Sequence, residues 1–417
     1  MRETPDHLPT PVCENFRWKG RDATRLANGV IELISVLGGG HLASFKLLGQ
    51  EDHLSQNVLW EAPWVTRDPS NAWPEDIARL YGPEEIGRFL ASYTGHSLCL
   101  DYFGAPADKS VSLGLSLHGE AAIRQWSMVQ SAPSKEAYCG WRVSLPVTQL
   151  TFEREIRLGE GESVAYVQET VSNERDSDHR CDWVQHVTFG PPFVRRGEST
   201  LAASAQRGIT WPSAYENRSL LAANRQFVWP YAPREGSDNF ADLRQPFSVK
   251  GHGYVAGMQL DAGRHIEFIL AINWKSHLGA GYCFRRSDFP WMTLWEENHA
   301  RQNAPWNGVT AACGMEFGTT PLPLGEQDSR QSKRIFDSPT GCTIPARGKK
   351  TAKYLIFLFT IPSRVRSVQN IATVGDAIVV YDEHREAVLS IPANGCENFL
   401  AESPDVDARD CIYATQL

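Results

Sequence analysis

Alternation of apolar and polar residues with a period of two recurs along most of the chain and constrains its fold more than any other feature. Across His265–Asn273, every second residue from Ile266 to Ile272 is apolar, which is the pattern of a strand with one buried face. Leu150–Leu158 alternates similarly, and a glycine-bearing turn at 159–161 leads into a further strand-like stretch, which together predict a β-hairpin. The chain is therefore expected to consist mainly of antiparallel strands.

Helical periodicity is limited to two short segments, Pro83–Ser92 and Arg364–Ala377. The 33 glycines and 25 prolines are spread along the sequence, and no Ser/Gly-rich linker, charge block or internal repeat marks a domain boundary. Although 417 residues could form two or three domains, all-β domains often reach about 250 residues or more. We therefore predict a single domain, 1–417, with peripheral extensions at about 1–25 and 395–417. The expected fold class is all-β, one large antiparallel β-sandwich with a few short helices.

The charge balance disfavours nucleic-acid binding. The 41 Lys and Arg residues are outnumbered by 49 Asp and Glu residues, which gives a formal net charge of −8, whereas nucleic-acid-binding domains are usually basic. The N-terminal residues are polar and proline-rich, unlike a secretory signal, and the most apolar run, Tyr354–Pro362, is far shorter than the roughly 20 residues that span a bilayer. The nine cysteines include no CxxC pair. These features predict a soluble, cytoplasmic protein with reduced thiols and without a membrane partner.

The sequence lacks the motifs of several enzyme classes. It contains no GxxxxGKS/T, no GxGxxG after a strand, no HExxH and no GxSxG. No motif therefore supports a nucleotide-binding protein, a zinc protease or a hydrolase with a nucleophile elbow. The glycine run at 38–40 follows one strand-like stretch and precedes another, which favours a tight turn over a phosphate-binding loop.

Three segments combine histidines, arginines or carboxylates with aromatic residues. Leu115–Trp126 contains a histidine and an arginine, Asp182–Phe193 places a histidine in an apolar strand, and Trp291–Pro321 contains three tryptophans and a glutamate that follows an apolar run. Aromatic-rich strands that end in polar residues suit carbohydrate binding, because sugar C–H faces pack on rings while hydroxyls need directed hydrogen bonds. The candidate site residues in these segments are His118, Arg124, Gln185, His186, Trp295, Arg301 and Glu316.

Each of these residues also has a purely structural interpretation. A histidine among valines, such as His186, can be a core residue that is satisfied by one hydrogen bond, and tryptophans are more often core residues than binding platforms. Glu316 is harder to explain structurally, because an unpaired buried carboxylate is costly. Glu296 and Glu297 are adjacent, so on a strand their side chains point to opposite faces and cannot both enter one site.

Six short elements occur in order along the chain: Asn28-Gly29 with the following strand and glycine turn, Asn57-Val-Leu-Trp60, His118-Gly119 with Arg124 and Trp126, Thr170-Val-Ser-Asn173, His186 with Phe189, and Gly314-Met-Glu316. Their order and rough spacing, from Asn28 to about Thr360, resemble the aldose 1-epimerase (galactose mutarotase) superfamily, particularly its uncharacterised bacterial branch. The resemblance implies a supersandwich, a large twisted two-sheet β fold that binds a sugar in a cleft across one face.

The resemblance also implies a chemistry. In mutarotation a base removes the proton of the anomeric hydroxyl while an acid protonates the ring oxygen, the ring opens, the aldehyde rotates about C1–C2, and the steps reverse. By resemblance Glu316 is the base and His186 is the acid, because an imidazole with a pKa of about 6.5 can give and retake a proton near neutral pH. The implied ligand is a small-molecule sugar or sugar derivative, without a metal or organic cofactor. The implied substrate-binding residues are His118, Arg124, Gln185, Trp295 and Arg301.

Two other classes of function stay open. A glycoside hydrolase or polysaccharide lyase can use a similar sandwich, and a hydrolase needs two carboxyls about 5 to 10 Å apart, which Glu316 with Glu120 or Glu297 could supply. A non-catalytic sugar-binding protein could keep the tryptophans without the acid–base pair.

Geometry separates these classes. The epimerase hypothesis predicts that His118, His186 and Glu316, each expected on a strand, converge on one concave sheet face. It also predicts that Glu316 and His186 face each other in one pocket without a second carboxylate. The particular sugar and the oligomeric state correspond to no pattern in the sequence.

Overall fold

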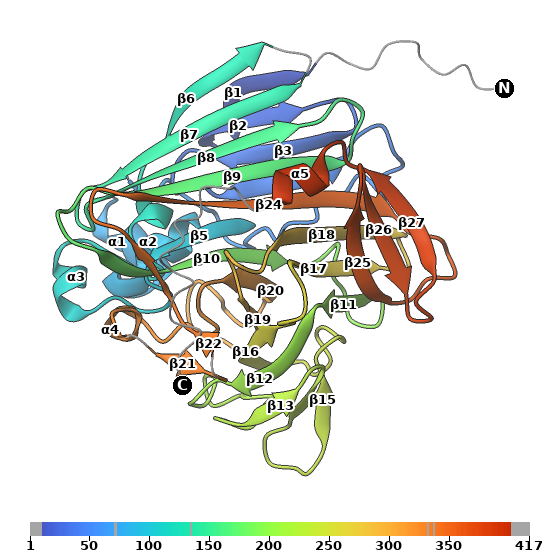
Figure 1. Ribbon diagram of the computed structural model, residues 1–417. Coiled ribbons are helices and arrows are strands. Elements are labelled where there is room, and N and C mark those ends of the chain that lie inside the picture. Colours follow the sequence, from blue (N-terminus) through green and yellow to red (C-terminus); the bar gives the residue numbers. More distant parts are fainter. Residues whose placement is uncertain (1–10, 71–72, 134–135, 332, 337, 402–417) are drawn as a thin grey trace, which may run out of the picture.

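The computed structural model describes residues 11–70, 73–133, 136–331, 333–336 and 338–401, and these consist mainly of β-strands (Figure 1). Two large antiparallel sheets pack on each other, and buried side chains from both form one continuous hydrophobic cluster between them. This arrangement confirms the expected all-β sandwich with a few short helices.

The larger sheet contains 14 strands, several of which are neighbours in space without being neighbours in sequence. In spatial order they are β1 (Val12–Trp18), β2 (Arg21–Ala27), β3 (Ile31–Val36), β4 (Leu42–Leu47), β5 (His96–Asp101), β10 (His179–Phe189), β20 (Ala311–Gly318), β19 (Trp291–Asn298), β16 (His252–Leu260), β12 (Ala205–Thr210), β13 (Gln226–Val228), β14 (Tyr231–Pro233) and β15 (Phe240–Asp242), with β23 (Cys342–Ile344) paired to one end of β10. The central strands β5, β10, β20 and β19 therefore bring together residues that are far apart in the chain.

The second sheet contains eight strands. In spatial order they are β11 (Ser199–Ala203), β17 (Ile266–Asn273), β18 (Leu278–Arg285), β24 (Lys349–Thr360), β9 (Val164–Asn173), β8 (Leu150–Leu158), β7 (Ala137–Leu145) and β6 (Ser127–Pro133). The predicted hairpin is present, since β8 and β9 pair in continuous register on either side of the turn at 159–161.

Short elements complete the fold. Helix α2 confirms the helix expected at Pro83–Ser92, with Pro83 as its N-terminal cap residue. The helices are α1 (Glu75–Ala78), η1 (Arg79–Tyr81), α2 (Glu84–Ser92), α3 (Asp108–Ser112), η2 (Ala121–Ile123), α4 (Glu326–Ser329) and α5 (Cys396–Leu400), and the remaining strands are β21 (Arg334–Ile335), β22 (Ser338–Pro339), β25 (Val368–Val374), β26 (Ala377–Asp382) and β27 (Ala387–Pro392).

The three-stranded sheet β25–β27 corrects two expectations from the sequence. Arg364–Ala377, where the pattern predicts a helix, contains strand β25 instead, because its β-branched residues pair with β26 across a tight turn at Gly375. This small sheet packs on the outer face of β17, where Phe268 shares a hydrophobic cluster with Ile371. As a result β17 is buried on both faces, not on one.

The ends of the described chain join or cover the sandwich. β1 is the edge strand of the 14-stranded sheet, and β2 pairs with both β1 and β3. The expected N-terminal extension, about 1–25, therefore includes β1 and most of β2, which belong to the sandwich. Helix α5 packs on the cluster of β17 and β25–β27 through Cys396 and Leu400. Residues 1–10 and 402–417 of the two expected extensions lie outside the described residues, and the single-domain organisation stays a prediction.

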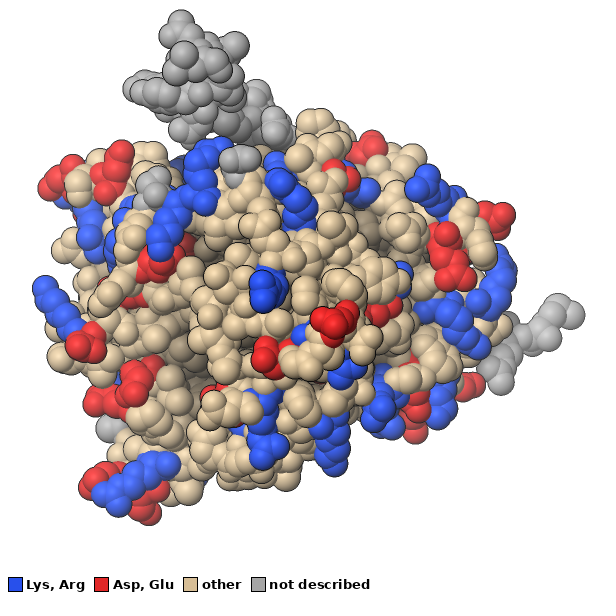
Figure 2. Space-filling model, turned by 90° about the horizontal axis from the view of Figure 1, so that it is seen from below, with Lys and Arg blue, Asp and Glu red and all other residues tan. Residues whose placement is uncertain are grey.

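Charged side chains of both signs are mixed on the surface. On the face shown in Figure 2, Lys and Arg lie among Asp and Glu, and neither sign covers the face continuously. The surface carries exposed ion pairs such as Arg17 with Asp22 and Arg347 with Asp176. Such pairs contribute little to stability, because water and salt screen them.

Candidate functional site

A cavity of about 380 Å³ lies on the outer face of the 14-stranded sheet, away from the core between the sheets. Its floor consists of side chains from four neighbouring strands: Val255 of β16, Thr293 and Trp295 of β19, His186 of β10 and Glu316 of β20. Helix α2 and loops that include residues 103–105, 211–216 and 301–306 form much of its walls. The volume is near the lower end for ligand sites, which suits a small molecule.

His186 and Glu316 lie side by side on the floor. The register of β10 and β20 pairs Gln185 with Phe317, so His186 comes opposite Glu316. The Nε2 atom of His186 is 3.4 Å from Oε1 of Glu316. Oε2 of Glu316 is buried and has no hydrogen-bond partner among the described residues, so this oxygen can accept a hydrogen bond from a ligand.

The second ring nitrogen of His186 is also engaged. Nδ1 is 3.2 Å from the Tyr93 hydroxyl and 3.3 Å from the Thr188 hydroxyl, and these two hydroxyls hydrogen-bond to each other. The contacts fix the orientation of the imidazole and keep Nε2 directed at Glu316.

Burial suppresses charge on both members of the pair. Desolvation raises the pKa of the Glu316 carboxyl well above its ordinary value, and it lowers the pKa of His186 to about 3. At a pH between these two shifted values the pair therefore holds one proton, which lies on the carboxyl. One group that can give a proton and one that can take it thus lie in direct contact.

Gly314 makes room for the Glu316 carboxylate. It lies two residues before Glu316 and so shares a face of β20 with it. A Cβ atom at position 314 would be 2.7 Å from Oε1 of Glu316 and 3.1 Å from the Trp295 ring. A side chain here would displace one of the two, so the glycine determines where the carboxylate stands.

His118 reaches the cavity from a turn, which corrects the expectation that it lies on a strand. Its backbone φ is 67°, and its Nδ1 accepts a hydrogen bond from the Gly104 amide at 3.2 Å. Burial holds the pKa of His118 well below its ordinary value, so the neutral ring carries its proton on Nε2 as a donor. The His118 and His186 ring centroids are 5.1 Å apart. The structure therefore brings His118, His186 and Glu316 together in one cavity.

Trp295 and Arg301 line the cavity as well. The Arg301 guanidinium is 4.8 Å from the Trp306 ring centroid, 4.9 Å from that of Tyr215 and 5.9 Å from that of Trp295, all within cation–π range. Its Nε atom is 3.5 Å from Glu216. Its side chain donates no hydrogen bond to the described residues, so the guanidinium nitrogens can donate to a ligand.

Gln185 and Arg124 do not line the cavity, and we correct their assignment as sugar-binding residues. Gln185 precedes His186 on β10 and therefore points to the opposite face, where it donates to Glu169 at 2.5 Å. Arg124 donates through Nε and Nη2 to Glu120, four residues earlier. Both side chains are occupied by partners within the protein.

The carboxylates that a hydrolase could use are placed differently. Glu120 is fully buried and, besides Arg124, accepts the amide of Thr148. Glu297 is also fully buried and lies behind the cavity wall. Glu216 does line the cavity, with a side chain that is 49% exposed. The cavity therefore contains a second carboxylate, contrary to the expectation for an epimerase.

Several lining residues were not apparent from the sequence. Tyr93 follows the helix that the sequence predicts, and Trp306 lies within the tryptophan-rich segment, so both had a local signal. Tyr215 and Glu216 lie in a loop without distinctive composition. Only the tertiary path of that loop places them at the cavity.

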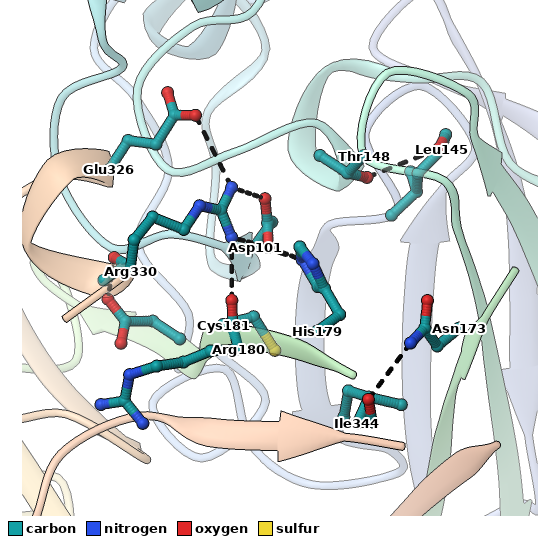
Figure 3. Close-up of polar contacts among 12 residues, drawn as sticks. Asp101, Leu145, Thr148, Asn173, His179, Arg180, Cys181, Glu326, Arg330 and Ile344 are labelled. Atoms are coloured by element: carbon teal, nitrogen blue, oxygen red, sulfur yellow. Dashed lines mark hydrogen bonds and ion pairs between the residues drawn. The ribbon is translucent and has the colours of Figure 1, made fainter. Parts of the chain in front are cut away.

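A buried charge cluster supports one wall of the cavity. Asp101 of β5 accepts two hydrogen bonds from Arg330 and is 2.5 Å from Nε2 of His179 on β10 (Figure 3). Arg330 follows helix α4, and the Gly325 amide at the start of that helix donates to the Phe103 carbonyl at 2.8 Å. The cluster thereby joins β5, β10 and α4 behind the wall segment that contains Phe103.

Within the part of the chain that the structure describes, no three His, Cys, Asp or Glu side chains are grouped to hold a metal ion. None of the helices in the same part is long and apolar enough to cross a membrane.

No protein-family model and no curated protein sequence matches the chain. Solved structures resemble it in fold. A candidate aldose 1-epimerase from Klebsiella pneumoniae has a TM-score of 0.59 at 16% identity, over 82% of this chain and 80% of that one. A candidate mutarotase from Salmonella typhimurium has a TM-score of 0.54 at 12% identity, over 84% and 94%. A galactose mutarotase-like protein from Clostridium acetobutylicum has a TM-score of 0.50 at 11% identity, over 84% and 99%.

The two-sheet architecture is thus a mutarotase-like fold, as the sequence resemblance implies. At these identities the likeness establishes the fold alone, because one fold hosts many chemistries. The function has to be argued from the cavity.

Proposed function

We propose that this protein is an aldose 1-epimerase-like isomerase that interconverts sugar anomers by acid–base ring opening. The observation that carries the proposal is the contact of 3.4 Å between Nε2 of His186 and Oε1 of Glu316 on the floor of the cavity. Mutarotation needs one acid and one base acting on the same substrate, and this pair holds one proton between two groups. The mutarotase-like fold supports the proposal.

In the proposed reaction Glu316 is the base and His186 is the acid. A sugar hydroxyl that donates to Oε2 of Glu316 favours the carboxylate form, and the carboxyl proton moves to Nε2 of His186. Glu316 then takes the proton of the anomeric hydroxyl while His186 gives its proton to the ring oxygen, so the bond between C1 and the ring oxygen breaks and C1 becomes an aldehyde. After rotation about C1–C2, His186 takes back the proton of the ring-oxygen hydroxyl while Glu316 gives its proton to the aldehyde oxygen, and the ring closes as the other anomer.

The remaining lining residues would bind the sugar. His118 offers its Nε2 proton, and Arg301 offers its terminal nitrogens, to hydroxyl or ring oxygens. Trp295 offers an aromatic face to sugar C–H groups. An acid–base pair that is positioned in this way typically contributes about 10² to 10⁴ in rate.

The presence of a second carboxylate, Glu216, in the cavity is the one observation that favours a hydrolase. A retaining or inverting hydrolase uses two carboxyls on opposite sides of the scissile bond, one of which keeps its proton through burial. Glu216 is 49% exposed and paired with Arg301 at 3.5 Å, as the ionised member of such a pair would be, but the group in direct contact with Glu316 is His186 and not a second carboxyl. The geometry therefore supports an epimerase better than a hydrolase.

An NMR screen tests the proposal. Freshly dissolved anomers of neutral aldoses and of aldose phosphates are mixed with the protein, and anomer exchange is followed alongside the cleavage of aryl glycosides and polysaccharides. We expect faster exchange for at least one aldose and no cleavage. Cleavage without exchange supports the hydrolase alternative, and sugar binding without either reaction supports a non-catalytic sugar-binding protein.

A further inference from the structure

Glu297 is a fully buried carboxylate that contacts cavity-wall residues without lining the cavity itself. Its Oε1 accepts hydrogen bonds from the backbone amides of Ala300 at 2.6 Å and Arg301 at 3.1 Å. Its Oε2 accepts the Tyr215 hydroxyl at 2.9 Å and is 3.9 Å from Nε of Arg301. Donors on both oxygens compensate the burial of this charge.

The network continues through Tyr215 to the cavity floor. Nε1 of Trp295 donates to the Tyr215 hydroxyl at 2.9 Å, and that hydroxyl donates to Glu297. Three cavity-lining side chains, from strand β19, the loop after β19 and the loop at 211–216, are thus tied to one carboxylate. Without this anchor the loop that carries Arg301 would have to be ordered when a ligand binds, at a cost in affinity.

We infer that Glu297 is a positioning residue for ligand binding. Its carboxylate holds the Arg301 loop and the Tyr215 hydroxyl, and it lies 3.9 Å from Nε of Arg301, so that the guanidinium is held at the cavity wall. The identity of the ligand as a sugar rests on the proposed function. The anchoring of the Arg301 loop by Glu297 is independent of the proposed function.

Glu296 offers a matched control. It precedes Glu297 on β19, is 1% exposed and points to the opposite face, where its Oε2 accepts the Phe247 amide at 2.6 Å. Glu296→Gln therefore changes an equally buried carboxylate on the same strand without reaching the cavity.

Two substitutions of Glu297 separate its two roles. Glu297→Ala removes both oxygens, so hydrogen exchange of the backbone amides at 299–309 should rise about tenfold or more. Glu297→Gln keeps an acceptor for the Ala300 and Arg301 amides but loses the charge that faces Nε of Arg301. It should therefore leave loop exchange near the wild-type level and raise KM for the sugar about tenfold, with kcat within about twofold.

Glu296→Gln is expected to change neither loop exchange nor KM. The inference is overturned if loop exchange in Glu297→Ala equals that in Glu296→Gln, or if Glu297→Gln binds and turns over the sugar like the wild type. If the wild type accelerates no anomer exchange, the proposed function fails, and the loop-exchange comparison, which needs no ligand, still decides whether Glu297 anchors the wall.

Discussion

His186 and Glu316 are neighbours across the β10–β20 strand pair, with Nε2 of one 3.4 Å from Oε1 of the other, although they lie far apart in the sequence. Two rigid strands hold them, so neither depends on a mobile loop for its position. Because burial disfavours charge on both, they share a single proton at any pH between their two shifted pKa values. In the proposed reaction this contact supplies the acid and the base.

Activity should depend little on pH between the lowered pKa of His186 and the raised pKa of Glu316. Protonation of His186, whose pKa burial lowers to about 3, inactivates the pair at low pH, and loss of the Glu316 proton, whose pKa burial raises, inactivates it at high pH. We expect kcat/KM to vary less than about twofold from about pH 5 up to the raised pKa of Glu316, and the apparent pKa values at either limit belong to the pair. A single titration step centred at about 6.5, the ordinary pKa of imidazole, would contradict this arrangement.

Gly314→Ala should lower both kcat and the free energy of unfolding. The added Cβ would come within 2.7 Å of Oε1 of Glu316 and move the carboxylate away from His186. We expect kcat to fall about 10²-fold, because small misplacements of reacting groups are costly, and the free energy of unfolding to fall by about 1 to 3 kcal/mol. Gly263→Ala is a suitable control, since a Cβ there meets nothing closer than 3.4 Å. Equal kcat values in the two variants would show that Gly314 does not set the carboxylate position.

Asp101→Asn should destabilise the protein in a pH-dependent way. Burial alone would raise the pKa of Asp101, but hydrogen bonds from Arg330 and His179 outweigh it and hold the pKa below its ordinary value. A depressed pKa contributes stability that is present above the unfolded-state pKa and is lost as pH falls through the folded value.

We expect Asp101→Asn to cost about 3 kcal/mol at pH 7, at the lower end for a buried pair because Arg330 is partly exposed. Urea unfolding at pH 7 and again in acid should show this difference shrinking as Asp101 of the wild type becomes protonated. A difference that stays constant with pH would argue against the ionic role of the cluster in Figure 3.

Glu296 should make the fold less stable at alkaline pH. Burial, with a smaller effect from Glu297, raises the pKa of Glu296 to about 8. A raised carboxyl pKa gives stability that is complete below the unfolded-state pKa of about 4.3 and is lost as pH rises through the folded value. Glu296→Gln should therefore lose less unfolding free energy than the wild type between pH 5 and 9 in urea titrations. Equal losses of unfolding free energy in the two proteins would contradict the raised pKa of Glu296.

The strands and the reactive pair could be anticipated from the sequence because they follow local rules. Alternation gives strands such as β8 and β17, and a glutamate or histidine within an apolar strand needs a partner or a purpose. On the same strand pattern, Gln185 and His186 are adjacent and point to opposite faces of the sheet. The assignment of both residues to one site is therefore inconsistent with that pattern. Arg124 likewise has a partner four residues away, in Glu120, that a local reading could have found.

The cavity walls could not be anticipated, because long-range contacts build them. Nothing local to Tyr215 or Glu216 indicates that their loop meets the one after β19. The strand β25 depends in the same way on pairing with β26, which overrides a weak helical periodicity. The turn at His118 is stabilised by Gly104, 14 residues earlier, and by Leu100 of β5, whose amide donates to the His118 carbonyl at 3.2 Å.

The role of Glu316 as the base is tested most directly by the rate of anomer exchange in Glu316→Gln, measured by NMR at saturating concentrations of a sugar that the wild type accepts. The amide is nearly isosteric with the carboxyl, so the fold and the sugar affinity, followed by tryptophan fluorescence, should be close to those of the wild type. Because the amide cannot take the proton of the anomeric hydroxyl, the enzyme-dependent rate should fall by at least about 10²-fold. Exchange at the wild-type rate in a variant that binds the sugar equally well would contradict the assignment of Glu316 as the base.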